Sequence, residues 1–272
     1  MMEVEDLVPV HGHIKRVTIL GVGLSPSSME HAVARIDDWI ARREQTYVCL
    51  AAVHSIMACR RDPSLRRIFN ASGLTTPDGM PLVWLTRLMS HQRVERVYGP
   101  DLMLAVCAHG IDRGYRHLFY GGEPSVPEEL AKRLLARFDG LQVAGTVAPP
   151  FGEPSEAERL SLNERINDSN ATIVWAGLGT GRQEMWMARN RAGLKAPVLI
   201  SVGAAFDFLS GRKPQAPVWI QHSGLEWLFR LATEPRRLWP RYREYPLFLV
   251  LLAGQLLGLT QPTAEEQTKS RR

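Results

Sequence analysis

The sequence of 272 residues has little cysteine and no recognisable metal or nucleophile motif. Its three cysteines, Cys49, Cys59 and Cys107, form no CxxC pair. This excludes a disulfide scaffold and a cysteine zinc site, and we expect the thiols to be reduced and mostly buried. The eight histidines form no HExxH cluster, and neither a GKS or GKT phosphate loop nor a GxSxG elbow occurs. The sequence therefore predicts neither a bound metal nor a cofactor.

Long apolar runs are also lacking. A membrane-spanning helix needs about 20 apolar residues, whereas the best candidate, Pro246–Leu259, has ten apolar side chains in fourteen positions. The N-terminal MMEVEDLVPV carries three acids and has neither the basic start nor the apolar core of a signal peptide. We therefore expect a cytoplasmic protein without a membrane-spanning helix.

Lysine and arginine exceed the acids by only five, 33 against 28. Much of this excess lies between residues 230 and 243, where five arginines accompany one acid, Glu234, directly before the apolar stretch. One interpretation is a plain solvated face. The sharper one is a surface for a diphosphate and an anionic membrane, because arginine matches phosphate oxygens and basic amphipathic helices lie in membrane interfaces. No nucleic-acid motif accompanies the patch, so we expect no nucleic acid partner.

Short β-branched runs alternate with helical patterns along most of the chain. The predicted strands are Val17–Leu20, Tyr47–Val53, Arg93–Val97, His117–Tyr120, Leu141–Val147, Thr172–Ala176 and Val198–Val202. The predicted helices include Ser27–Arg43, an arginine-rich one after the second strand, Met80–Met89, Leu102–Arg113, Val126–Phe138, Glu156–Asn167 and Gln183–Arg191. This alternation predicts an α/β fold: a Rossmann-like, mostly parallel sheet flanked by helices, with ligands bound beyond the strand ends.

After about residue 215 the pattern becomes helical. We predict an α/β domain over residues 1–215 and a helical C-terminal appendage with a polar tail over 216–272. Its helices are expected at Gly224–Leu231, at Pro235–Tyr245 and in the apolar stretch.

Three segments after predicted strands could carry chemistry. In TTPDGMPLVW (75–84), Asp78 either caps the helix from Met80 or faces the cleft as a general base. In AGLGTGRQEMW (176–186), the glycines form either a plain turn or a cradle for a diphosphate; the spacing is not that of a dinucleotide fingerprint. In SVGAAFDFLSG (201–211), Asp207 could cap a helix, pair with an arginine or face a ligand.

Six segments together resemble one known family. They are RRDPSLRRIFNASGLTTPDGMPLVW (60–84), RVYGPDLM (96–103), FYGGEPSV (119–126), GLGTGRQEMWMARNR (177–191), SVGAAFDFLSG (201–211) and GLEWLFRLATEPRRLWPRY (224–242). Their order and sequence are similar to the WecG/TagA/CpsF glycosyltransferases (glycosyltransferase family 26), and closest to members from exopolysaccharide operons.

The resemblance implies an inverting, metal-independent glycosyltransferase of the N-acetylmannosaminyltransferase type. It would transfer a sugar from a nucleotide donor, typically a UDP-sugar, to a polyprenyl-diphosphate-linked sugar in exopolysaccharide or cell-surface polysaccharide synthesis. It further implies peripheral association with the inner face of the cytoplasmic membrane. Asp78 would be the catalytic base. The substrate-binding residues would be Gly177, Gly179, Thr180, Gln183, Asp207, Arg230, Arg237 and Arg241.

The chain also departs from the family pattern. Where many members have Thr-x-Asn after the second strand, it has Leu50 and Ala52, with His54 two residues further on. We expect His54 to have an ordinary helix-start role. These departures motivate an alternative, a catalytically inactive protein that binds nucleotide sugars for regulation on the same fold.

Overall fold

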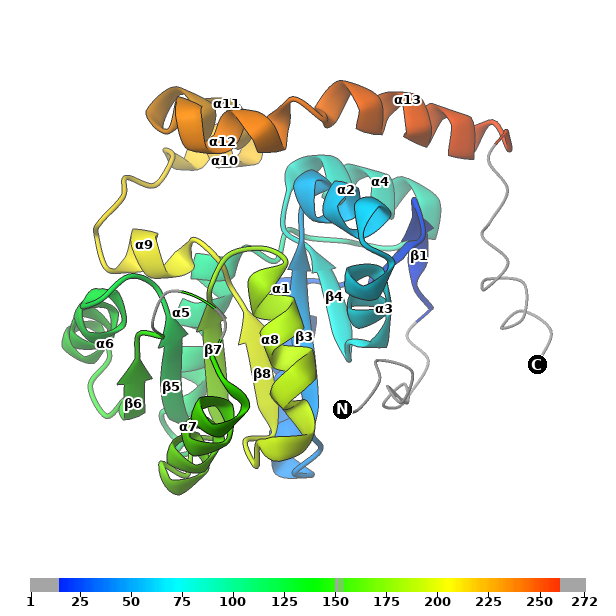
Figure 1. Cartoon of the computed structure of the whole chain (residues 1–272). Helices are drawn as coiled ribbons and strands as arrows, with labels where there is room; N and C mark the ends of the chain where they lie inside the picture. The colour runs from blue at the N-terminus through cyan, green and yellow to red at the C-terminus, as the bar shows by residue number, and fades with distance from the viewer. Residues whose placement is uncertain (1–14, 150–151, 153, 260–272) are drawn as a thin grey trace, which may run out of the picture.

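The computed structural model describes residues 15–149, 152 and 154–259. At its centre is a six-stranded sheet with the order β4-β3-β8-β7-β5-β6, in which every neighbouring pair is parallel (Figure 1). The strands are β3 (Thr46–Ala51), β4 (Leu74–Pro77), β5 (Arg116–Gly121), β6 (Gln142–Val147), β7 (Ile173–Gly177) and β8 (Val198–Ser201). The predicted α/β fold with its parallel sheet is confirmed.

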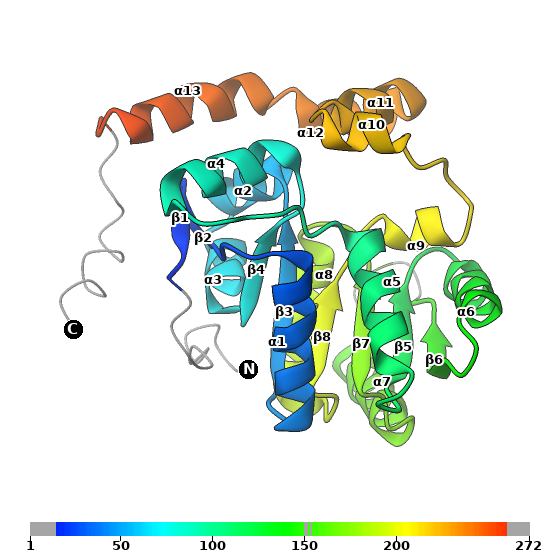
Figure 2. The same ribbon diagram turned by 180° about the vertical axis from the view of Figure 1, so that it is seen from behind.

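Helices cover both faces of this sheet and form two apolar cores. One face carries α2 (Val53–Arg61), α3 (Pro63–Ala71), α4 (Met80–Ser90), α7 (Glu156–Asp168) and α8 (Arg182–Asn190). The other carries α1 (Met29–Ala41), α5 (Gly99–Gly110), α6 (Val126–Arg137) and α9 (Ala205–Leu209), as the reverse view in Figure 2 shows.

The inner strands are mostly apolar because both of their sides are covered. In β3, Tyr47 and Cys49 contribute to one core, whereas Val48 and Leu50 contribute to the other. All three cysteines are free and buried, as predicted.

The predicted strand at the N-terminus is present, but it lies outside the parallel sheet. It is β1 (Val17–Ile19), which pairs antiparallel with β2 (Val22–Leu24). Leu20 and Gly21, with φ of 48° and 85°, form the two-residue turn between them.

The segment 93–97, predicted as a strand, is extended but not a strand. It makes only two backbone bonds to neighbouring segments, from Glu95 to Ser27 and from Val97 to Pro77. Two short helices, α9 and α10 (Val218–His222), were not predicted because five residues are too few to show a helical period.

The C-terminal helices lie across the carboxyl ends of the strands (Figures 1 and 2). They are α10, α11 (Glu226–Thr233), α12 (Pro235–Tyr242) and α13 (Tyr245–Leu256). Phe248 and Leu252 of α13 are buried in the core beside α2, and the Gln255 side chain bonds backbone atoms of Thr18 and Leu20. Within the residues that the structure describes, no helix is both long and apolar enough to cross a bilayer.

A buried arginine holds together the ends of β3 and β8 that lie away from these helices. The Arg191 guanidinium donates to four carbonyl oxygens, those of Thr46 (3.1 Å), Leu194 (2.6 Å), Ala196 (2.5 Å) and Pro197 (3.4 Å). Burial lowers the pKa of Arg191 to about 10, so the guanidinium is still charged at neutral pH.

We predict that Arg191→Met destabilises the protein, because hydrogen bonds from a charged donor contribute more than neutral ones and the freed carbonyls stay buried. The free energy of unfolding, measured by urea denaturation, should fall by about 2–4 kcal/mol. The control is Arg165→Met on the exposed side of α7, which should change it by less than about 0.5 kcal/mol. Equal stability of the two variants would contradict the role given to Arg191.

Candidate active site

A cavity of about 590 Å³ opens between the carboxyl ends of the strands and the C-terminal helices. The structure brings every site residue predicted from the sequence to its wall, from elements more than 150 residues apart in the chain. These residues are Asp78, Gly177, Gly179, Thr180, Gln183, Asp207, Arg230, Arg237 and Arg241. The location is the one expected for an open α/β sheet, where ligands bind beyond the carboxyl ends of the strands.

Asp78 follows β4 directly and lies on the cavity wall. Its backbone N–H donates to the Ala51 carbonyl at 2.8 Å, which continues the pairing of β3 and β4. The N-cap of α4 is Gly79, and no side chain caps this helix. The capping interpretation of Asp78 is therefore wrong, and its carboxyl group remains available to the cavity.

The surroundings of Asp78 make it a stronger base than an ordinary aspartate. Burial raises its pKa to about 6, although the nearby Arg96 acts in the opposite direction. Glu226 raises this pKa further. The side chain is still 28% exposed, so a substrate can reach it. A carboxyl group with a pKa near the working pH is suited to general base catalysis.

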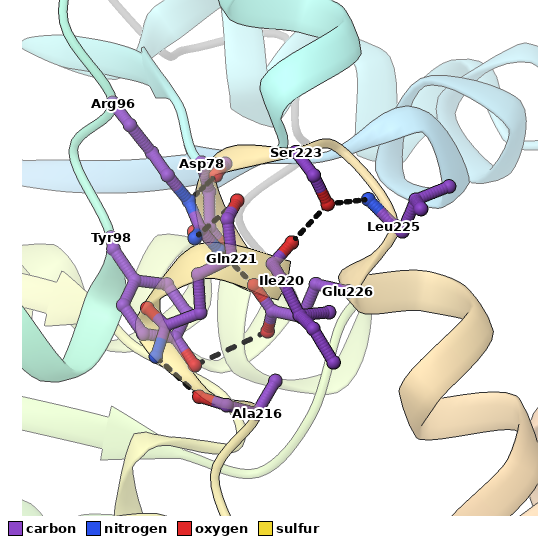
Figure 3. A network of polar contacts seen from close by, with 9 residues as sticks. All are labelled: Asp78, Arg96, Tyr98, Ala216, Ile220, Gln221, Ser223, Leu225 and Glu226. Atoms are coloured by element: carbon purple, nitrogen blue, oxygen red, sulfur yellow. Dashed lines mark hydrogen bonds and ion pairs between the residues drawn. The ribbon is translucent and has the colours of Figure 1, made fainter.

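Arg96 is the centre of a network around Asp78 that the sequence analysis missed (Figure 3). Its Nε donates to the Asp78 carbonyl at 2.5 Å, and its Nη2 lies 3.6 Å from the Asp78 carboxylate. The same Nη2 bonds Glu226 of α11 at 2.5 Å, and the guanidinium lies 3.9 Å from the centre of the Tyr98 ring. Arg96 lies in the segment predicted as a strand. Its place two residues before the sequence YGP (98–100) was the only sign in the local sequence that it could belong to the site.

The glycine segment after β7 is held in shape by two buried side chains. Gly179 and Gly181 have φ of 84° and 89°, which other residues rarely adopt. Glu184 accepts from the Gly181 N–H at 2.7 Å and from the Gln183 amide at 2.8 Å. The Gln183 oxygen accepts from Gly203 N–H at 3.1 Å, so Gln183 joins the two loops that follow β7 and β8.

Gly177 has a packing role, since a Cβ at this position would lie 2.6 Å from the Phe206 ring. The close approach of this loop to α9 therefore requires glycine.

Basic side chains dominate the charge of the cavity, with six against three carboxylates. Asp207 pairs with Lys213 at 2.6 Å, and Arg237 pairs with Glu234 at 2.5 Å. Among the described residues, three of these cations have no carboxylate partner: Arg182, Arg230 and Arg241. Burial, followed by the charge of Arg230, lowers the pKa of Arg241. Two neighbouring guanidinium groups without a counterion form a site for an anion such as a diphosphate.

Within the described ranges, no group of three histidine, cysteine, aspartate or glutamate side chains could hold a metal ion.

Comparison with known proteins identifies the family. The model of the glycosyl transferase WecG/TagA/CpsF family matches residues 17–262, which include the sheet and all the C-terminal helices. The chain belongs to this family. It is also similar to the N-acetylglucosaminyldiphosphoundecaprenol N-acetyl-beta-D-mannosaminyltransferase of Bacillus spizizenii. The identity is 24% over 209 residues, covering 77% of this chain and 79% of that protein.

The positions expected from the resemblance to depart from the family pattern lie at the cavity. Leu50 and Ala52 both line the cavity and make that part of its wall apolar. His54 lies beside them in the first turn of α2, and its Nε2 is 2.9 Å from the Thr180 hydroxyl. Burial, reinforced by Arg241 and Arg230, lowers the pKa of His54 well below its usual value. His54 is therefore a neutral partner of the glycine segment, not only a residue at the start of a helix.

Proposed function

We propose that this glycosyltransferase moves a sugar from a nucleotide-diphosphate donor, a UDP-sugar, to a sugar carried on a polyprenyl diphosphate. The configuration at the anomeric carbon of the transferred sugar is inverted. The reaction would serve the synthesis of an exopolysaccharide or other surface polysaccharide. One observation carries the proposal: a carboxylate with a raised pKa, Asp78, opens into a cavity that holds two neighbouring arginines, Arg230 and Arg241, neither of which is paired with a carboxylate. The name of the Bacillus relative, a transferase to a diphosphoundecaprenol-linked sugar, supports this choice of acceptor.

In the proposed step, the Asp78 carboxylate takes the proton of an acceptor hydroxyl. The oxygen forms a bond to the anomeric carbon of the donor sugar from the face opposite the diphosphate. The bond between this carbon and the diphosphate oxygen breaks, and its electron pair leaves with the nucleoside diphosphate. A single displacement of this kind inverts the anomeric configuration.

The charge that develops on the leaving diphosphate has to be stabilised. We assign this role to Arg230 and Arg241, together with the glycine segment 177–181, because they lie on one cavity wall and the two arginines lack counterions. Arg237 and Asp207 also line the cavity and are held in ion pairs.

The direct test is a transfer assay. The full chain is incubated with candidate UDP-sugars and a short-chain polyprenyl-diphosphate-linked N-acetylglucosamine, with and without EDTA, and the products are separated by mass. We expect one donor to be consumed, with a single added sugar, at a rate that EDTA leaves unchanged. The apolar Leu50 and Ala52 wall supports the alternative, a regulatory protein without activity. Binding of UDP-sugars without transfer for any donor would favour that alternative.

An acceptor on a lipid carrier has to be reached at a membrane, and we propose that the C-terminal helices lie on it. Eleven of the fifteen exposed large apolar side chains that the structure describes lie between residues 218 and 259. They include Trp219, Leu249 and Val250, which are 70%, 63% and 68% exposed. The five arginines between residues 230 and 243 lie in the same part of the chain, and their charge favours binding to the anionic inner face of the cytoplasmic membrane.

We predict that the double variant Leu249→Glu/Val250→Glu binds anionic liposomes about 100-fold more weakly, because it loses apolar burial and adds repelled charge. Both side chains point away from the core, so the fold should persist. Flotation of the protein with the vesicles measures the effect. Leu160→Glu, at an exposed apolar position on α7, is the control and should float like the wild type. If the double variant floats equally well, these side chains do not contact the membrane.

A further inference from the structure

We propose that Glu226, the first residue of α11, is a positioning residue for the base: it holds Arg96 away from the Asp78 carboxylate. The inference rests on the proposed function, in which Asp78 removes the acceptor proton. It adds a group from the C-terminal helices, to which neither the sequence nor the family resemblance assigned a role.

The geometry shows an unequal sharing of one guanidinium. Arg96 Nη2 lies 2.5 Å from a Glu226 oxygen but 3.6 Å from the Asp78 carboxylate. The second Glu226 oxygen accepts from the Tyr98 hydroxyl at 3.2 Å. Both partners of the close pair are nearly buried, with side chains 11% and 13% exposed. Figure 3 shows the Glu226 carboxylate directed at Arg96 and Tyr98.

This sharing leaves the base free. The Oδ1 atom of Asp78 is buried and has no hydrogen-bond partner within the described structure. An oxygen without a hydrogen-bond partner leaves the negative charge of the carboxylate less stabilised and the group more basic, whereas a carboxylate held by an arginine fork is a weaker base. If Glu226 were neutral, Arg96 could turn fully toward Asp78.

The charges that face Asp78 come from three elements. Arg96, on the extended segment before α5, and Arg230 of α11 favour its ionised form. Glu226 of α11 and Asp101 of α5 oppose ionisation, in addition to burial. Glu226 also binds Arg96, the cation that acts most strongly on Asp78. Removing the charge of Glu226 therefore lowers the pKa of Asp78 in two ways: its own repulsion is lost, and Arg96 is released toward the Asp78 carboxylate.

The last C-terminal helix, α13, is held in place by contacts that do not involve Glu226. Phe248 and Leu252 bury α13 in the core, Gln255 bonds the β1–β2 turn region, and Glu244 pairs with Arg61 of α2. The close contact of Glu226 is instead directed at the residue that touches the base.

The test is the pH dependence of kcat and KM for Glu226→Gln. Glutamine keeps the size and the acceptor atom but removes the charge. In the wild type we expect activity to fall below an apparent pKa of about 6. In the variant this acid limb should move down by about one pH unit. At the plateau kcat should fall about tenfold, while KM for the donor changes by less than about twofold, since a base of lower pKa removes the proton more slowly.

Two further variants and a stability measurement distinguish a role of Glu226 in positioning Arg96 from a purely structural role. Glu244→Gln removes a carboxylate from the same segment without touching the site and should keep the wild-type profile. Glu226→Asp keeps the charge, so its acid limb should stay at the wild-type pH; this variant also serves if the glutamine variant unfolds. An acid limb of Glu226→Gln that coincides with the wild type, or a loss confined to KM or to thermal stability, overturns the proposal. So does an acid limb of Glu226→Asp displaced by a full unit.

Asp78→Asn in the same assay tests the proposed function separately. If that variant transfers as fast as the wild type, the role of the base itself is wrong. If it is inactive while Glu226→Gln behaves as the wild type, only the present inference fails.

Discussion

Asp78→Asn should reduce sugar transfer by about 10²–10⁴-fold, the usual contribution of a general base. Asparagine has nearly the same shape but cannot accept the proton of the acceptor hydroxyl. We expect the loss in kcat, with the KM of the donor nearly unchanged, because the diphosphate is bound elsewhere on the wall. The rate of product formation over pH 5–9 measures it. Asp139→Asn, at an exposed position beyond α6, should transfer like the wild type, and equal rates for both variants would exclude Asp78 as the base.

The same substitution should stabilise the fold at neutral pH. The pKa of Asp78 is about 6 in the folded protein and about 3.9 in an unfolded chain. Below pH 4 the group is neutral in both states. As the pH rises from 4 to 6 the unfolded chain loses its proton first, so the free energy of unfolding falls and then stays lower. Asparagine never ionises, and the variant should gain about 2 kcal/mol at pH 7–8 and nothing at pH 3.5.

Urea denaturation at these two pH values checks the sign as well as the size of this effect. A gain that is equal at both pH values would mean that the raised pKa is not its source. The combination of a lost activity with a gained stability is typical of a side chain kept charged in a buried place for its chemistry.

Replacing Arg230 and Arg241 together by glutamine should lower kcat/KM by about 10³-fold. Each guanidinium is available to the diphosphate because no ion pair with a carboxylate has to be broken first. Removing one arginine should weaken UDP binding by about 30-fold, measured by titration calorimetry. The double variant should not unfold more easily without ligand, since the two like charges no longer repel each other.

The neighbouring arginines provide graded controls. Arg237→Gln should have a smaller effect, because Glu234 already pairs with this side chain. Arg236→Gln, an exposed position of α12 that does not line the cavity, should bind UDP as the wild type does. If all four single variants lose affinity equally, the patch acts by its overall charge and not specifically through Arg230 and Arg241.

Much of the architecture follows from local patterns in the sequence. The alternation of β-branched runs with helical periods predicted a parallel sheet, because each pattern spans only a few residues of one element. The glycine turns and Asp78 could be located for the same reason, since strand ends and turn residues are local signals. Conversely, Arg93–Val97 has the composition of a strand, but only the neighbouring chain decides whether its backbone groups are paired.

The sequence by itself thus determined the fold class, the family and nine of the residues that line the cavity. Only the tertiary structure decided which of their charged side chains are held in ion pairs and which are available to a ligand. Arg96 meets Glu226 across 130 positions of the chain, and Lys213 neutralises Asp207 beside Glu234. Burial and charge at Asp78 depend on helices that follow it by about 150 residues. Ion pairs and pKa values are set by distance in space and by the exclusion of water, and neither quantity can be read from position along the chain.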